Sequence, residues 1–141
     1  VIRPALFETP GANPHPDLLP RQVVEIQLDA LRRSDPSDDG IAVAYRFASA
    51  MNQMHTGPLS RFGAMLKSDD YATLLDHIGV EFGPTVDLDS RSYVPVVVTN
   101  DAGVSTAFIW VLSRSKTNPC GDCWMTDAVI PAGSLDRIRF A

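Results

Sequence analysis

The order of two hydrophobic periods constrains the fold of this chain more than any other feature. Apolar residues recur with a period near 3.6 over about residues 17–75 and with a period of two over residues 78–130. Because the expected helices all precede the expected strands, the chain does not alternate strand and helix as a parallel nucleotide-binding sheet does. We expect an α+β domain whose N-terminal helices pack on a curved, mostly antiparallel four-stranded sheet.

Capping and start signals divide the helical half into three helices and one further turn. They are expected over residues 17–34, 41–54, 58–66 and 71–75. Asp17 is the expected cap of the first helix, with Pro20 in its first turn. Turn signals near Pro36 and Gly57 separate the helices, so breaks are predicted at both positions.

Alternating apolar residues predict the strands of the second half. They are expected over residues 80–86, 93–99, 104–114 and 123–130. Residues 100–103, with the sequence Asn-Asp-Ala-Gly, favour a tight hairpin turn between the second and third strands.

The two ends of the chain lack this periodicity. Residues 1–16 contain four prolines and are expected to form an extended docking arm, residues 17–131 a single domain, and residues 132–141 a tail. Each end carries an apolar pair with no place in the periodic core, Leu6 with Phe7 and Ile138 with Phe140. The pairs either fold back over their own sheet or dock on a neighbouring subunit, and we assign all four residues to partner docking.

Charge and hydropathy exclude two classes of partner. The formal net charge is −5, and lysines and arginines are scattered rather than gathered in a stripe, which argues against a nucleic-acid partner. No apolar run approaches the roughly 20 residues that cross a bilayer. Membrane association is therefore expected to be peripheral at most, through partner proteins.

The only motif with a chemical name is Cys120-Gly-Asp-Cys123. Redox pairs of this spacing depend on a helix N-terminus and nearby cations, whereas here Asp122 lies between the thiols in a loop that enters a strand. Two cysteines make half of a zinc site, and the histidines are far apart in the sequence: His15, His55 and His77. We expect no catalytic, metal or cofactor residue here, and either two free thiols or a local disulfide between Cys120 and Cys123.

An isomerase-like reaction would need an acid or base in an apolar mouth that raises the pKa of a carboxyl group. The residue types that could serve are Asp127, Tyr45, Tyr93 and His55. Each also has an ordinary place on a helix or strand, and their spacing makes no dyad. Trp110 and Trp124 could line such a pocket, but large aromatic residues on strand faces are more often part of the core.

Four strings of residues carry a family resemblance. They cover residues 23–31, 45–49, 61–68 and 123–126. They resemble the landmarks of the family called domain of unknown function 4864, with Ala50 standing where that family has proline. The order of the elements resembles the cone-shaped fold of nuclear transport factor 2 and the ketosteroid isomerases. The resemblance spans roughly residues 18–130.

The resemblance implies a fold and a compartment rather than a reaction, because the family has bacterial and plastid members and no agreed activity. Because the chain begins at Val1 rather than Met, we expect a processed mature protein. The expectation is a non-catalytic accessory subunit, without a cofactor, that docks through its arm, its tail and one open sheet face on other protein subunits of a chloroplast photosystem at the thylakoid. The alternative is a small-ligand-binding or isomerase-like enzyme that uses the cavity of the cone.

Overall fold

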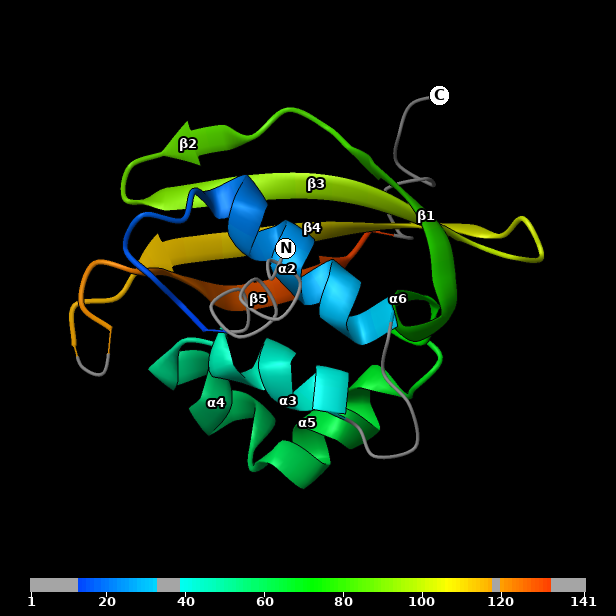
Figure 1. Cartoon of the computed structure of the whole chain (residues 1–141), viewed down its shortest axis with the longest axis horizontal. Helices are drawn as coiled ribbons and strands as arrows, with labels where there is room; N and C mark the ends of the chain where they lie inside the picture. Colours follow the sequence, from blue (N-terminus) through cyan, green and yellow to red (C-terminus); the bar gives the residue numbers. More distant parts are fainter. Residues whose placement is uncertain (1–12, 33–38, 118–119, 133–141) are drawn as a thin grey trace, which may run out of the picture.

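The structure of the chain is a computed structural model that describes residues 13–32, 39–117 and 120–132 (Figure 1). Within these residues the helices precede the strands, so the α+β class and the order of elements are confirmed. The helices are α2 (Pro20–Arg32), α3 (Asp39–Arg46), α4 (Ala50–Thr56), α5 (Leu59–Leu66) and α6 (Thr73–Asp76). The strands are β1 (His77–Phe82), β2 (Val86–Leu88), β3 (Arg91–Asn100), β4 (Ser105–Arg114) and β5 (Trp124–Pro131).

The strands form one sheet in the order β1-β3-β4-β5, with β2 also paired to β3, and all these pairs are antiparallel. The sheet therefore has five strands rather than the expected four. Val86 does not continue β1, because the Gly83 N–H makes a last bond to the Pro95 carbonyl (2.9 Å) and Pro84 has no N–H to extend the ladder. The chain pairs with β3 again only at Val86.

The predicted hairpin turn joins β3 to β4. The Asn100 side-chain oxygen accepts hydrogen bonds from the N–H groups of Ala102 and Val104, both at 3.0 Å. Gly103 has φ +83°, a left-handed conformation that glycine adopts without strain. This local chemistry fixes the register in which Val94 lies opposite Trp110 and Val96 opposite Phe108.

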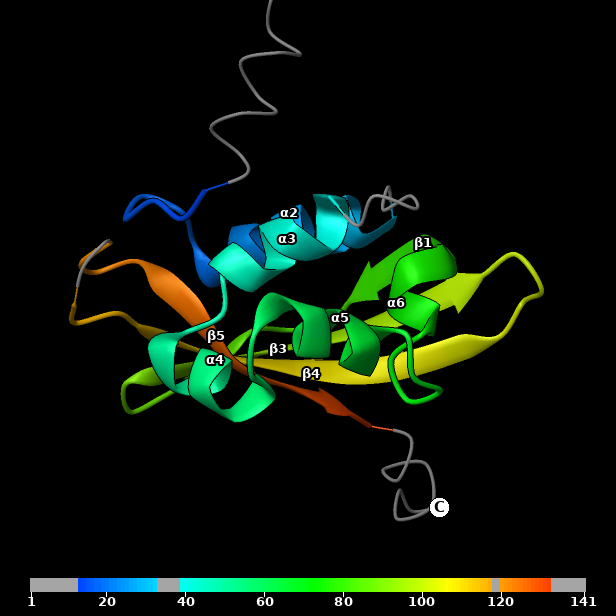
Figure 2. The ribbon, with the colours of Figure 1, turned by 90° about the horizontal axis from the view of Figure 1, so that it is seen from below.

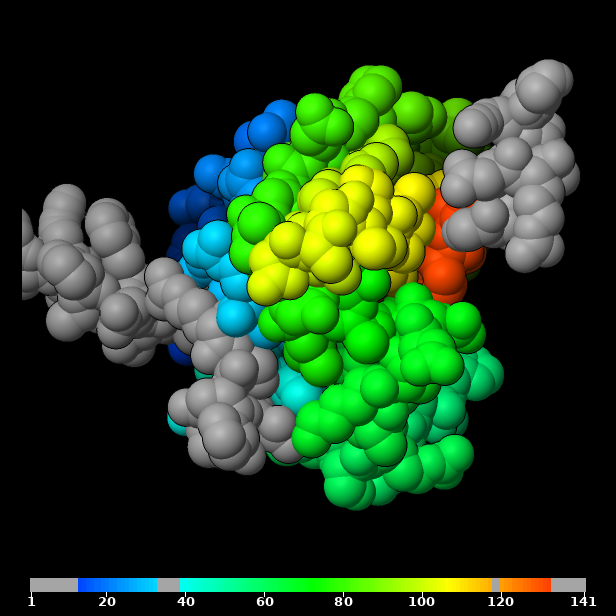
Figure 3. All heavy atoms as spheres, turned by 90° about the vertical axis from the view of Figure 1, so that its right-hand side faces the viewer, coloured from blue at the N-terminus to red at the C-terminus, as the bar shows by residue number. Residues whose placement is uncertain are grey.

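The core lies between the helices and one face of the sheet. Alternate residues of β3 and β4 are buried there, and α2 and α3 supply the opposing apolar stripes. In Figure 2, α2 and α3 lie on one side of the sheet, and no described helix covers the other side. Figure 3 views the end that carries the β3–β4 turn (yellow), with α2 (blue) on one side and β5 (orange) on the other.

The helix expected over residues 41–54 is broken after Arg46. The Thr126 N–H donates to the Phe47 carbonyl (2.7 Å), and the Ser49 N–H donates to the Thr126 carbonyl (2.8 Å). This makes an isolated parallel bridge between Ala48 and Thr126. The Ser49 hydroxyl oxygen then caps α4 by accepting from the Asn52 N–H (3.2 Å). The break therefore attaches the helical layer to β5.

A second interaction between the layers is buried. The Gln27 side-chain amide of α2 donates to the Thr126 hydroxyl at 2.8 Å, and both side chains are buried. A pair that is satisfied in this way avoids the free-energy penalty of a lone buried polar group. It also fixes the position of α2 along β5.

The start of the first helix differs from the expected position. Helix α2 begins at Pro20 rather than at the Asp17 cap, because the Gln22 side-chain oxygen accepts the Leu19 N–H (2.8 Å) in place of an Asp17 carboxylate. The break at Gly57 is confirmed, since Gly57 closes α4 with φ +82°. The predicted break at Pro36 lies outside the described residues. None of the helices in the described part of the chain is long and apolar enough to span a membrane.

Candidate functional site

Packed side chains occupy the space between the helices and the sheet. Trp110 and Phe108 project from β4, Phe47 comes from the end of α3, and all three are at most 1% exposed. The Tyr71 ring stacks on Phe108 with centroids 6.0 Å apart. The Trp110 indole N–H is buried and has no hydrogen-bond partner in the described structure.

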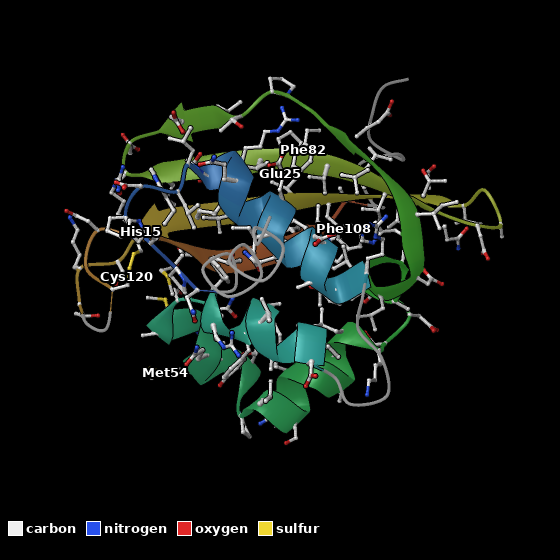
Figure 4. The ribbon with its side chains drawn as sticks, in the orientation of Figure 1. His15, Glu25, Met54, Phe82, Phe108 and Cys120 are labelled. Atoms are coloured by element: carbon white, nitrogen blue, oxygen red, sulfur yellow. A yellow bond between two sulfur atoms is a disulfide. The ribbon has the colours of Figure 1, made fainter. Side chains whose placement is uncertain are left out.

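A pocket of about 790 Å³ lies at the end of the molecule where β4 leads into β5. We call it the end pocket. Figure 4 shows two of its residues, His15 and Cys120, at this end. Its volume is in the range of small-molecule sites. It is lined by residues 13–16, by Arg46, Ala48, Ser49, Ala50, Met51 and Gln53 around the α3–α4 junction, and by Ser113, Ser115, Lys116, Thr117, Cys120, Met125 and Asp127.

The ionisable side chains of the end pocket come from different elements. Arg46 ends α3, Lys116 follows β4, and Asp127 is the extra residue of a β-bulge in β5, where Leu112 pairs with Thr126 and Val111 with Ala128. The Asp127 carboxylate has no hydrogen bond or ion pair with another described residue. The His15 Nδ1 accepts the Asp17 N–H at 3.1 Å, which leaves Nε2 as the ring nitrogen that carries a hydrogen.

The loop on one side of the end pocket is held by several bonds. Cys120 and Cys123 are joined by a disulfide, with their Cα atoms 5.7 Å apart. The Ser115 N–H donates to the Cys123 carbonyl (2.7 Å), and the Asp122 N–H donates to the Ser115 carbonyl (2.8 Å). No group of three or more metal-ligating side chains occurs in the described residues. Cys120 places the disulfide loop in the wall of the pocket.

The sheet face opposite the helices is apolar. We call it the outer face. The register places Val97 opposite Ala107, Pro95 opposite Ile109 and Tyr93 opposite Val111. The apolar or aromatic side chains on this face are Val86, Leu88, Tyr93, Pro95, Val97, Ala107, Ile109, Val111, Ala128 and Ile130. Met125 lies on the same side of the sheet and is counted with the end pocket, which it lines.

Exposure is greatest at the margins of the outer face, where Leu88 is 58% and Ile130 47% exposed. Their central neighbours Pro95, Val97 and Ile109 are half-buried, and Val111 is buried. A contiguous apolar face of this kind is typical of a surface that contacts another molecule.

His77 lies at the start of β1, beside a shallow groove that α2 lines with Glu25, Asp29 and Arg32. Its side chain is buried, and its Nδ1 is 2.8 Å from the Leu74 carbonyl oxygen. Burial lowers the pKa of the His77 imidazole below its ordinary value of 6.5, and this effect outweighs the hydrogen bond to Leu74, which acts in the opposite direction. Folding therefore favours the neutral ring.

The lowered pKa of His77 predicts an acid-sensitive fold. The unfolded chain binds the proton more readily, so the free energy of unfolding should fall as the pH is lowered through 6.5 towards the folded-state pKa. Urea unfolding at pH 7.5 and at mildly acidic pH, compared between the wild type and His77→Gln, measures this. In His77→Gln the free energy of unfolding should fall less on acidification than in the wild type. The matched variant His55→Gln, at an exposed histidine, should show the same fall as the wild type. Identical pH dependence in the wild type and His77→Gln would contradict the assignment.

The structure separates the residues that the sequence offered for isomerase-like chemistry. Tyr45 donates its hydroxyl to the Gly57 carbonyl (2.9 Å) and packs edge-on against Phe62, Tyr93 lies on the outer face, and His55 is exposed on α4. Of the four candidates only Asp127 lines the end pocket.

The other candidates fall in different places. Trp110 is a core residue, whereas Trp124 is half-buried with the Arg114 guanidinium 4.8 Å from its ring centroid. The assigned docking residues lie outside the described residues: Leu6, Phe7, Ile138 and Phe140. The sequence reasoning missed Arg46 and Lys116, which have no linear signal. It expected one open sheet face as a docking surface but did not name the residues on that face.

Comparison with known proteins identifies the family. No curated protein and no solved structure matches the chain. A family model does match it over residues 17–132, which is most of its length. The chain therefore belongs to the family described as domain of unknown function (DUF4864).

Proposed function

We propose that this domain is a non-catalytic subunit that docks on a larger protein assembly through the outer face of its sheet. The observation that carries the proposal is the row of apolar side chains on a sheet face that no described helix covers. Soluble monomers rarely expose a contiguous apolar surface of this kind, and such surfaces commonly mark interaction sites.

The composition of the outer face favours a protein partner. Val97 and Ile109 are β-branched and Pro95 is cyclic, so these side chains lose little conformational freedom when a partner covers them. Charged residues stand at the margin: Arg91 pairs with Ser113 at one end of β3, and Glu81 on β1 pairs with Val97. An apolar centre with a charged rim is the usual anatomy of a protein–protein interface.

The partner that we propose is an assembly of protein subunits in the chloroplast, with a photosystem at the thylakoid as the specific case. Support comes from the family resemblance, since the family has plastid members. Leu6, Phe7, Ile138 and Phe140 would add contacts beyond the outer face. The same resemblance supports the finer assignment of the fold to the nuclear transport factor 2-like cone.

A charge on the outer face is expected to release the subunit from its assembly. In cells of the source organism, tagged wild-type protein should migrate on a native gel with a large complex. The double variant Val97→Asp/Ile109→Asp should migrate as the free 15.3-kDa chain, because docking would bury two carboxylates without partners.

A matched control uses Val104, which is 54% exposed at the β3–β4 turn and away from the outer face. Val104→Asp should remain in the complex. Circular dichroism of the purified variants checks that each one is folded. If the folded double variant still migrates with the complex, docking through the outer face is wrong.

A further inference from the structure

We propose that the end pocket binds a small organic acid: a carboxylate with an apolar body and a hydroxyl or amine that can donate a hydrogen bond. This inference is independent of docking through the outer face. It takes up the alternative that the sequence left open, ligand binding, but places the ligand at the end of the molecule rather than in the packed interior.

The size and shape of the pocket fit a small molecule. Its volume of about 790 Å³ lies within the roughly 300–1,000 Å³ of known ligand sites. Met51 from α4 and Met125 from β5 supply flexible apolar surface on two different sides. Unbranched thioether side chains adapt to apolar ligands of different shape.

The charges around the pocket favour a carboxylate. Arg46 and Lys116 supply two basic side chains, and the His15 ring, whose Nδ1 accepts the Asp17 N–H, presents an Nε2–H donor, against the single carboxyl group of Asp127. The Arg46 guanidinium has five N–H donors in a planar fork, so it can hold a ligand carboxylate in addition to its other contacts. The basic side chains of the pocket therefore favour a ligand that carries a carboxylate.

Asp127 adds the second feature of the ligand. This residue lies at the β5 bulge and lines the pocket, where its carboxylate has no partner in the described structure. An ionised carboxylate accepts hydrogen bonds and donates none. It would repel a second acidic group on the ligand and accept a hydrogen bond from a hydroxyl or amine.

The walls are held in place before any ligand arrives. Residues 47–49 are bonded to Thr126, and the loop after β4 is closed by the Cys120–Cys123 disulfide and by the two backbone bonds of Ser115. A preformed site loses less conformational entropy on binding than one that must be ordered by its ligand.

The test is an NMR titration of the full chain with 6-hydroxy-2-naphthoate, using its primary amide as the matched neutral probe. The acid should cause saturable shifts of the backbone amides of residues 48–53 and 113–117. It should bind about tenfold more tightly than the amide, because a hydrogen bond to a charged group is stronger than one to a neutral group.

Two variants test the charges. Lys116→Gln, at an exposed side chain, should weaken binding of the acid about two- to fivefold and leave the amide unchanged. Asp127→Asn should tighten binding of plain 2-naphthoate, which lacks the hydroxyl, because it removes a like charge.

Three results would overturn the proposal. They are equal affinity for the acid and the amide, shifts confined to the outer face, and no saturation at millimolar probe. The double variant Val97→Asp/Ile109→Asp should bind the acid as the wild type does. If that variant loses docking but still binds the acid, the two sites are separate. If the wild type docks but does not bind the acid, only the ligand proposal is wrong.

Discussion

Replacing Trp110 with alanine is expected to lower the free energy of unfolding by about 3–5 kcal/mol. Trp110 is among the largest fully buried side chains, and it projects from the middle of β4 into the space between the sheet and the helices. Its loss leaves a cavity that close-packed neighbours fill only in part. Urea unfolding followed by circular dichroism measures the change.

Two matched variants locate the source of that loss. Trp110→Phe should be much milder than Trp110→Ala, because it keeps most of the ring volume and removes a buried N–H that has no described partner. Trp124→Ala should also be milder, since that ring is half-buried. Added indole should restore part of the stability of Trp110→Ala by filling a dry apolar cavity. A loss below about 1 kcal/mol in Trp110→Ala would mean that the interior is loosely filled.

Substitution to aspartate is expected to prevent folding at one valine of β3 and to be tolerated at the next. Val96→Asp should prevent folding, because this side chain is 1% exposed between Phe82 and Phe108 in the register of the sheet. An unpaired buried carboxylate costs several kcal/mol, out of a total stability of about 5–15 kcal/mol for an ordinary domain. Val97 lies on the outer face, so Val97→Asp should change the free energy of unfolding by about 1 kcal/mol or less.

The two valines are measured side by side by circular dichroism and proton NMR. A dispersed spectrum for Val97→Asp and a collapsed one for Val96→Asp would support the register of β3. A register shifted by one residue would exchange the two outcomes.

The element order could be predicted because the period of burial is local information. Val94, Val96 and Val98 alternate with half-buried residues along β3. Phe108, Trp110 and Leu112 are likewise buried along β4, where Val111 between the last two is also buried. Each strand therefore reveals its inward face without reference to any other. The hairpin turn was predictable for the same reason, since the Asn100 side chain bonds only to its own turn.

The missed break between α3 and α4 has a tertiary cause. Phe47 and Ala48 are apolar and continue the helical stripe, and no glycine or proline interrupts them. The helix ends there because Thr126, far away in the sequence, takes the backbone groups of Phe47 and Ser49. The one local signal was Ser49, a good N-cap residue directly before α4.

The end pocket could not be predicted for a similar reason. Its walls come from the segment before α2, the α3–α4 junction and the β4–β5 connection, which meet only in the folded chain. Asp127 illustrates the difficulty. Alternation from Trp124 places it on the same side of β5 as Met125, but the α3–α4 junction that completes the pocket beside them comes from far away in the sequence.

The unequal edges of the sheet limit how copies of this chain can polymerise. Along β5, the backbone N–H and C=O of Thr126 are bonded to residues 47–49, and the Val129 carbonyl accepts the Tyr71 hydroxyl at 2.9 Å. Along β1, no described strand pairs with the outer side, and Ile78 is 63% exposed. Edge-to-edge pairing can therefore join β1 to β1, and the merged sheet then ends in two occupied β5 edges. Such growth stops at a pair instead of extending into a fibre.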